Sequence, residues 1–227
     1  KYGKFAYSSR FGFSGDVEFG WADLGTDSTL LVSDGSGTRT RWNIEDAFVE
    51  DGMVWSRWRP WDDVVIDTVL CGGTPWHHRI HLVRTGRPVT VTDTGFAVGV
   101  DSLWFGREGG ADQGPGHVLI RTPEALSGIR GADGEGSARP LPPNANMMEP
   151  HAAMPTLTTE VEPGDHVLAR SVLASGDPGS TMWDAPPDPP PRAFALLERE
   201  RDRVVDAAAP DAGADALRRH RSGGDDR

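Results

Sequence analysis

Short runs of alternating apolar and polar residues, separated by turn residues, dominate the chain before residue 175. Phe5, Tyr7, Phe11 and Phe13 share one parity, which is typical of a strand. Residues 40–50 and 53–59 flank an Asp51-Gly52 pair, and this dipeptide favours a two-residue hairpin because both of its positions accept positive φ. A strand-like run about every ten residues predicts an antiparallel β-sandwich.

Residues 64–71 are apolar on both parities, which indicates a strand covered on both faces. Turn residues surround the other short runs, and we find no alternation of strands with helices. The expected strands beyond those already named are residues 29–32, 76–84, 89–92, 96–98, 103–105, 117–121 and 166–173. The fold class is therefore predicted to be all-β.

The chain changes character after Ser175. A Pro-rich linker follows, then residues 191–209 with the partial helical spacing of a marginal helix, and residues 212–227 are small and charged. We expect order to end near Ser175 and limited proteolysis to remove the remainder, a disordered or marginally helical tail. The expected organisation is a junction strand at residues 1–14 from a missing upstream domain, a β-sandwich at 15–175, and a linker, helix and tail at 176–227.

Composition excludes several classes of function. The net charge of −11, without a local basic patch, argues against nucleic-acid binding. No apolar run reaches the ~18 residues that a membrane span needs. The lone Cys71 excludes an intrachain disulfide, which slightly favours a soluble protein of the cytoplasm. The chain begins at Lys1 as if cut from something longer, so an N-terminal signal cannot be assessed.

The densest polar constellation lies at residues 76–81. On a strand, alternation places His77, Arg79 and His81 on one face and Trp76 and Ile80 on the other. The polar face is either the lining of a cleft or a solvated outer surface, and the pattern alone supports both equally. His77 and His81 would lie about 13 Å apart on a strand, too far to share a zinc ion. We therefore expect no metal and no cofactor.

Tyr7 and Arg10 form a second candidate. Tyrosine can act as an acid or base in sugar chemistry, and arginine can pair with a uronate carboxylate. Without further context, an ordinary strand with one polar face is the favoured interpretation. Three of the eight tryptophans, Trp55, Trp58 and Trp61, are candidates for a planar sugar-binding patch, although most tryptophans are expected in the core. The acidic pairs Glu45-Asp46 and Asp62-Asp63 are expected at edges or turns, because adjacent strand residues point to opposite faces.

Four runs, at residues 1–14, 76–81, 94–98 and 143–146, resemble the family called domain of unknown function 2264. The resemblance covers about Lys1 to Ser175. It implies a larger two-domain protein with an N-terminal (α/α) toroid and a C-terminal antiparallel β-sandwich, similar to heparinase II/III-like polysaccharide lyases. Some relatives are classed with glycoside hydrolases that act on glucuronides. The toroid would carry most of the active-site cleft.

We therefore expect the C-terminal β-sandwich of a larger glycan-degrading enzyme, a glucuronidase-like hydrolase or a polysaccharide lyase, which packs on a helical toroid and is inactive alone. The expected partners are that toroid and an oligo- or polysaccharide, including uronate-containing ones. Tyr7 and His77 are the weak catalytic candidates, and Arg10, His77, Arg79 and His81 are the substrate-binding candidates. The polar strand face should point toward the toroid, with Ile80 in the core. The alternatives are a free-standing carbohydrate-binding sandwich or a purely structural one.

Overall fold

The computed structural model describes residues 30–40, 44–72, 75–96, 98–100, 110–121, 125–141, 151–177 and 179–203. The strands expected at residues 5–13 and 103–105 lie outside this part of the chain. The described residues form twelve strands: β1 (Leu30–Ser33), β2 (Thr38–Thr40), β3 (Ile44–Glu50), β4 (Met53–Trp61), β5 (Val64–Gly72), β6 (Trp76–Thr85), β7 (Val89–Thr94), β8 (Val98–Val100), β9 (Ala111–Arg121), β10 (Leu126–Leu141), β11 (His151–Val161) and β12 (Gly164–Ser175). A 3₁₀ turn, η3 (Met182–Asp184), and the helix α3 (Pro191–Glu200) follow.

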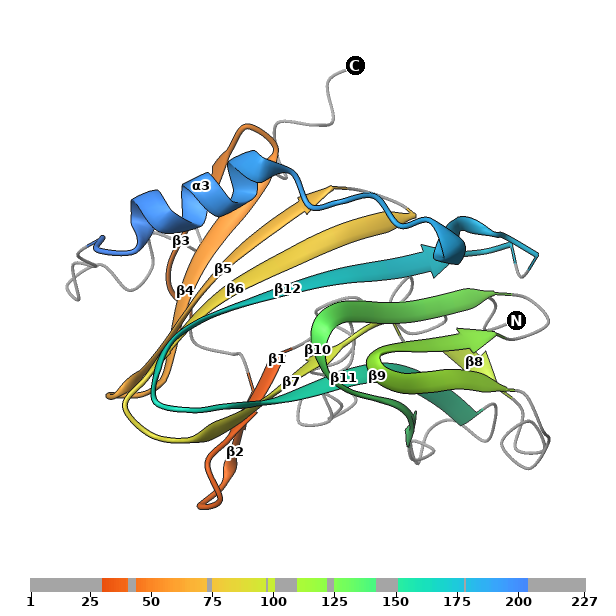
Figure 1. Ribbon diagram of the computed structural model, residues 1–227, viewed down its shortest axis with the longest axis horizontal. Coiled ribbons are helices and arrows are strands. Elements are labelled where there is room, and N and C mark those ends of the chain that lie inside the picture. Colours follow the sequence, from red (N-terminus) through yellow and green to blue (C-terminus); the bar gives the residue numbers. More distant parts are fainter. Residues whose placement is uncertain are drawn as a thin grey trace.

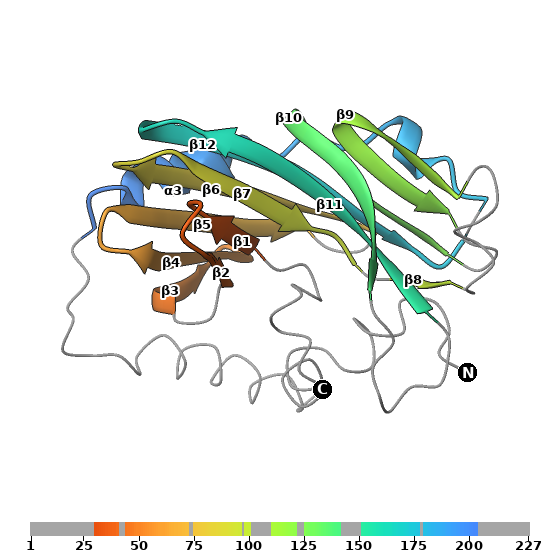
Figure 2. The same ribbon diagram turned by 90° about the horizontal axis from the view of Figure 1, so that it is seen from below.

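All strand pairs are antiparallel, and the strands form a single sheet in the order β2-β1-β7-β11-β10-β12-β6-β5-β4-β3, with β8 beside β11 and β9 beside β10. The sheet curls, so that β1, β7 and β11 face the layer formed by β12, β6, β5 and β4 (Figures 1 and 2). The all-β antiparallel sandwich expected from the sequence is confirmed. No helix in the described part of the chain is long and apolar enough to cross a membrane.

Strand β10 turns the corner between the two layers. Its first part, Leu126 to Gly131, pairs with β12, and its second part, Glu135 to Leu141, pairs with β11. The register of β10 against β9 shifts between the two parts. Gly134 has a φ of 97° in this bend, a conformation that residues with a Cβ rarely adopt. One long strand therefore belongs to both layers and joins them covalently.

The space between the layers is filled by aliphatic side chains from both. One core cluster joins Leu30, Val32 and Val91 of the first layer to Ile66 and Val83 of the second. These positions follow the period of two along each strand, since Val64, Ile66 and Thr68 point inward and Asp67, Val69 and Cys71 point outward. Strand β5 is thus covered on both faces, as its sequence predicts.

The outer face of the second layer is covered by the C-terminal segment. Helix α3 lies across β4, β5 and β6 (Figure 1), and it buries Ala193, Leu196 and Leu197 there. Trp183 of η3 is buried in a cluster with Trp76 and stacks on its ring at 5.8 Å. The expectation that order ends near Ser175 is therefore wrong for residues 179–203, because their apolar side chains complete the outer core. Residues 204–227, where disorder is expected, lie outside the described part.

Candidate functional site

The polar face of β6 points into the space between the two layers. His77, Arg79 and His81 lie on this inner face, and Ile80 lies on the opposite face in the core beneath α3. The alternation predicted from the sequence is therefore present. The inner face is polar at this point because charged side chains from three other strands, β7, β10 and β12, meet it.

Asp93 of β7 is at the centre of these contacts. Its Oδ1 atom lies 2.9 Å from Nε2 of His81 and 3.6 Å from Nη1 of Arg79. Its Oδ2 atom lies 3.4 Å from Nε of Arg170 on β12. The carboxylate is completely buried. Asp93 of the first layer thus interacts with three basic side chains of the second layer.

Further hydrogen bonds fix each of these bases. The Nδ1 atom of His81 lies 2.9 Å from the hydroxyl of Thr68, and Arg79 donates to the carbonyl of Thr94 at 2.7 Å. Arg170 donates to the hydroxyl of Thr159 and to the carboxylate of Asp133, both at 2.6 Å. Buried charges are stable only when they are paired and hydrogen-bonded, and this network satisfies that condition.

The electrostatics of the network keep Asp93 ionised. Burial opposes the charged form of Asp93, but the adjacent His81, Arg170 and Arg79 outweigh it and hold the pKa of this carboxyl well below its usual range. Replacing this carboxylate by its neutral acid would remove the negative charge that faces Arg79, His81 and Arg170, while Arg170 would keep its ion pair with Asp133.

Neither interpretation of the polar face of β6, as the lining of a cleft or as a solvated outer surface, describes Arg79 and His81. Arg79 and His81 are only 2% and 0% exposed, and they connect the two layers of the sandwich. A saccharide cannot reach them in this structure. Tyr7 and Arg10 lie outside the described residues, so their proximity to this strand remains a prediction.

His77 differs from the other two because it lies at the margin of the network and is partly exposed. Its Nε2 atom accepts hydrogen bonds from Nε and Nη2 of Arg79, both at 3.2 Å, and its ring meets Phe96 edge-on at 5.3 Å. Burial, with smaller effects from Arg79 and His78, lowers the pKa of His77 to about 3. A neutral imidazole of such low basicity is a hydrogen-bonding group and a weak general base.

The shift predicts a loss of stability in mild acid. Because the pKa of His77 is about 3 when folded and 6.5 otherwise, the unfolded chain binds more protons between these values. The free energy of unfolding should therefore fall by about 1–2 kcal/mol between pH 7 and pH 5. His77→Gln keeps an acceptor for Arg79 and should reduce this slope, although His78, whose pKa is also lowered, still contributes. Urea titrations at both pH values measure the change, and equal slopes for both proteins would contradict the assignment.

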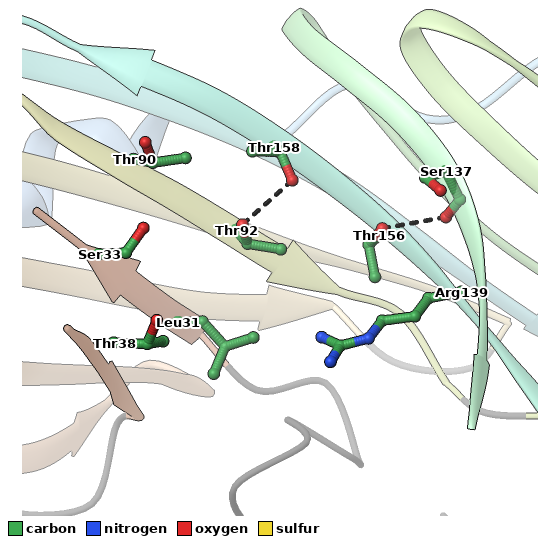
Figure 3. A pocket seen from close by; sticks show the side chains of 9 residues that line it. All are labelled: Leu31, Ser33, Thr38, Thr90, Thr92, Ser137, Arg139, Thr156 and Thr158. Carbon is green, nitrogen blue, oxygen red and sulfur yellow. Dashed lines mark hydrogen bonds between the residues drawn. The ribbon is translucent and has the colours of Figure 1, made fainter. Parts of the chain in front are cut away.

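An open cavity of about 320 Å³ lies on the outer face of the first layer, over β1, β7, β11 and β10 (Figure 3). Its lining is formed by hydroxyl side chains together with one aliphatic and one cationic residue: Leu31, Ser33, Thr38, Thr90, Thr92, Ser137, Arg139, Thr156 and Thr158. The threonines occur here because the outward positions of these strands are polar while the inward positions hold Val32, Val89 and Val91. No polar motif in the sequence marks this site, because its residues come from five strands.

The cavity has both paired and available polar groups. The hydroxyls of Thr92 and Thr158 are 3.0 Å apart, and Thr156 donates to the carbonyl of Ser137 at 3.0 Å (Figure 3). Arg139 is exposed, and no ion pair with an acid is found for it within the described ranges. The cavity therefore offers hydroxyl donors and acceptors and one guanidinium, at the lower end of the roughly 300–1,000 Å³ typical of small-molecule sites.

The three candidate tryptophans do not form the flat patch that the alternative of a carbohydrate-binding sandwich requires. Trp55 and Trp58 are 0% and 4% exposed and point to opposite faces of β4, because their positions differ by three, an odd number. Trp61 is covered by the guanidinium groups of Arg39 and Arg87, at 5.9 and 5.4 Å from its ring. Among the described residues, no group of three or more His, Cys, Asp or Glu side chains is placed to hold a metal ion.

Several solved structures are similar to this chain. Among solved structures, similar ones include heparan sulfate lyase HepC from Pedobacter heparinus (7% identity, TM-score 0.44, 60% of this chain and 22% of that chain covered). Another is the polysaccharide lyase BACCELL_00875 (18% identity, TM-score 0.35, 66% of this chain and 25% of that chain covered). A third is a heparinase III, the BT4657 gene product (6% identity, TM-score 0.41, 60% of this chain and 22% of that chain covered). This chain thus spans about a quarter of their length or less. No curated protein matches the sequence.

One family model matches most of the chain. The model of the DUF2264 C-terminal domain matches residues 1–185, which include all twelve strands and η3. The resemblance noted in the sequence is therefore confirmed over the whole sandwich. The chain belongs to the family of the DUF2264 C-terminal domain.

Proposed function

We propose that this chain is the C-terminal β-domain of a larger glycan-degrading protein, and that it binds saccharide at the cavity on the outer face of β1, β7, β11 and β10. The cavity carries the proposal, because a sugar ring with many hydroxyls needs hydrogen-bond donors and acceptors at close spacing, and this surface provides them in a row of threonines and serines. Membership of a family described as a C-terminal domain supports an upstream partner, which we take to be the helical toroid implied by the resemblance.

The buried network supports a proposal in which this domain binds saccharide and the catalytic groups lie elsewhere in the protein. Arg79 and His81 stabilise the contact between the layers, and His77 is a weak base, so these side chains are poor candidates for catalysis. The acidic pairs give no alternative, since Asp62 and Asp63 form the turn between β4 and β5 and Glu45 is paired with Arg59. Catalytic groups would then lie outside the described residues, and hydrolase and lyase chemistry both remain within the proposal.

Arg139 should decide the preference for acidic saccharides. Removal of its charge by Arg139→Gln is expected to weaken binding of a uronate-containing oligosaccharide by about 10–100-fold, because a hydrogen bond to a charged group contributes about 1.5–3 kcal/mol. Thr92→Val should weaken the binding of acidic and of neutral oligosaccharides to the same extent. Isothermal titration of the purified chain measures both, with Arg192→Gln on the exposed side of α3 as the matched control. Binding that neither cavity variant weakens would refute the site.

The chain alone should show negligible glycan turnover. The reason is that no pair of carboxylates or other acid and base faces the cavity among its lining residues. Incubation with uronate-containing polysaccharides and measurement of new chain ends tests this expectation. Saturable turnover by the purified chain would place catalysis in this domain and contradict the proposal that the catalytic groups lie elsewhere, while leaving the binding measurements above as an independent test.

A further inference from the structure

Helix α3 and the surface beneath it belong to different parts of the chain. The family match ends at residue 185, whereas α3 begins at Pro191. The surface that α3 covers is made by β4, β5 and β6, which lie within the family domain. The domain thus carries an apolar face whose cover is supplied by a segment beyond the domain.

Only one face of α3 makes apolar contacts with the sheet. Ala193, Leu196 and Leu197 are at most 3% exposed, while Phe194 points away and is 38% exposed. The receiving surface is formed by apolar side chains on the outward positions of the three strands: Met53, Trp55, Val69, Cys71, Ile80 and Leu82. This arrangement is that of an amphipathic helix lying with its apolar stripe in a hydrophobic groove.

The sheet also provides a charged receptor for the end of the helix. Arg57 is 4% exposed and donates to the carbonyl of Glu200 at 2.9 Å, to that of Arg201 at 3.0 Å, and to that of Arg203. A helix leaves its last carbonyls without partners, and a cation at this end is favourable. Because Arg57 contacts main-chain oxygens, it recognises a helix end whatever side chains that end carries.

Arg57 is held in position by the sheet itself. Its Nε and Nη2 atoms donate to the two oxygens of Asp67 at 2.5 and 2.8 Å, and Arg84 donates to the same carboxylate at 2.9 Å. All three residues lie on β4, β5 and β6, so the receptor exists independently of the helix.

An acidic rim surrounds this receptor and faces the basic end of α3. Arg199 pairs with Glu50 at 2.7 Å, Arg203 pairs with Asp46 at 2.8 Å, and Arg201 pairs with Asp165. Such exposed pairs contribute little to affinity but select the orientation and the charge of a partner. The rim therefore matches a helix whose C-terminal end is basic.

The connection to α3 is an extended segment without helix or strand. Residues 185–190 contain four prolines, and such segments act as semi-rigid spacers. We propose that the outer face of β4, β5 and β6 is a binding site for an amphipathic helix with a basic C-terminal end, which α3 fills from within the chain and which accepts the same helix in trans. The proposal is independent of saccharide binding, which concerns the opposite layer.

A cut in the connecting segment tests this proposal on the folded chain. A specific protease site placed at residues 186–189 allows cleavage after folding, and a labelled synthetic peptide of residues 186–203 is then added in excess. We expect the labelled peptide to replace the cleaved helix and to bind the cut chain but not the intact one. A peptide with Leu196→Asp should bind about 100-fold more weakly, because it loses a fully buried leucine. A peptide with Phe194→Asp is the matched control and should bind as the wild type does.

Fluorescence anisotropy reports peptide binding, and circular dichroism reports the fold of the cut chain. Exchange that depends on Leu196 but not on Phe194 supports the site. The proposal is overturned if the cut chain unfolds as the helix leaves, since α3 is then an integral part of the core. It is equally overturned if no exchange occurs within a day at a 100-fold excess of peptide, or if both variant peptides bind equally.

Discussion

Replacement of Asp93 by Asn is expected to lower the free energy of unfolding by about 3–5 kcal/mol. The substitution keeps the shape of the side chain and removes the one charge that Arg79, His81 and Arg170 share. Arg79 and Arg170 would then remain between the layers without the Asp93 carboxylate, and Arg170 would keep its ion pair with Asp133. Urea denaturation at pH 7, followed by tryptophan fluorescence, measures the change.

Asp202→Asn is the matched control, because Asp202 is exposed at the end of α3 and its replacement should change the stability by less than about 0.5 kcal/mol. The pKa of Asp93 is depressed in the folded state, so its contribution is present above about pH 4 and is lost as the pH falls below that value. The Asp93→Asn protein should therefore lose less stability below pH 4 than the wild type. A variant as stable as the control would show that the network contributes nothing to the contact between the layers.

The second large effect is expected at Arg57. Arg57→Met keeps the apolar stem but leaves Asp67 buried with Arg84 as its remaining cation, and it frees the carbonyls at the end of α3. Loss of one partner of a buried pair costs about 3–5 kcal/mol. Hydrogen exchange should also show faster opening of α3 than of the inner strands, because the helix loses its receptor while the core between the layers is unchanged.

Arg59 provides the comparison on the same strand. It forms an ion pair with Glu45 at 2.8 Å, but both side chains are about a third exposed. Arg59→Met should cost less than about 1 kcal/mol, as is usual for surface pairs. If Arg57→Met and Arg59→Met reduce stability equally, then Arg57 does not act as the buried anchor of the helix.

The local signals in the sequence predicted the strands of the second layer well. Asp51 and Gly52 form the hairpin turn between β3 and β4, with φ values of 49° and 75°. The boundaries of β5 and β6 agree with the expected runs to within one residue. These elements are specified by neighbours in the sequence, so period and turn chemistry suffice. The long strand β10 was missed, because it lacks a strict alternation and contains four glycines and the turn-like pair Asp133-Gly134 in its interior.

The direction of the polar face could not be predicted from its own strand. The alternation of His77, Arg79 and His81 is local, but their partners are brought to them by β7 and β12. A signal for this existed in the sequence. Asp93 shares the parity of Val89 and Val91, and Arg170 shares that of Leu168 and Val172, so each places a charge in an otherwise apolar set. Opposite charges at such positions on separate strands indicate an internal pair.

Helix α3 lies within the expected residues 191–209, but its packing on the sheet was not predicted. Helix α3 has a thin apolar stripe, and such a helix is marginal when it is alone. Its stability comes from the sheet, through the groove of Trp55, Val69 and Ile80 and through Arg57. Neither contribution is visible in residues 191–203. The cavity on the opposite layer was missed for the same kind of reason, since its lining comes from five strands.

The corner strand β10 has a consequence for the order in which the protein can assemble. The meander from β3 to β6 is complete early in synthesis, because each of its strands pairs with the next. Its inner surface stays open until β7 folds across it, and β7 is held there by hydrogen bonds to β1 and to the distant β11. Strand β11 is linked to β12 by the short turn at residues 162–163 and by their shared neighbour β10. Pairing of such distant segments is slow. The nascent chain therefore exposes Ile66 and Val83 until β7 covers them. The polar side chains on the inner face of β6 keep part of this exposed surface compatible with water.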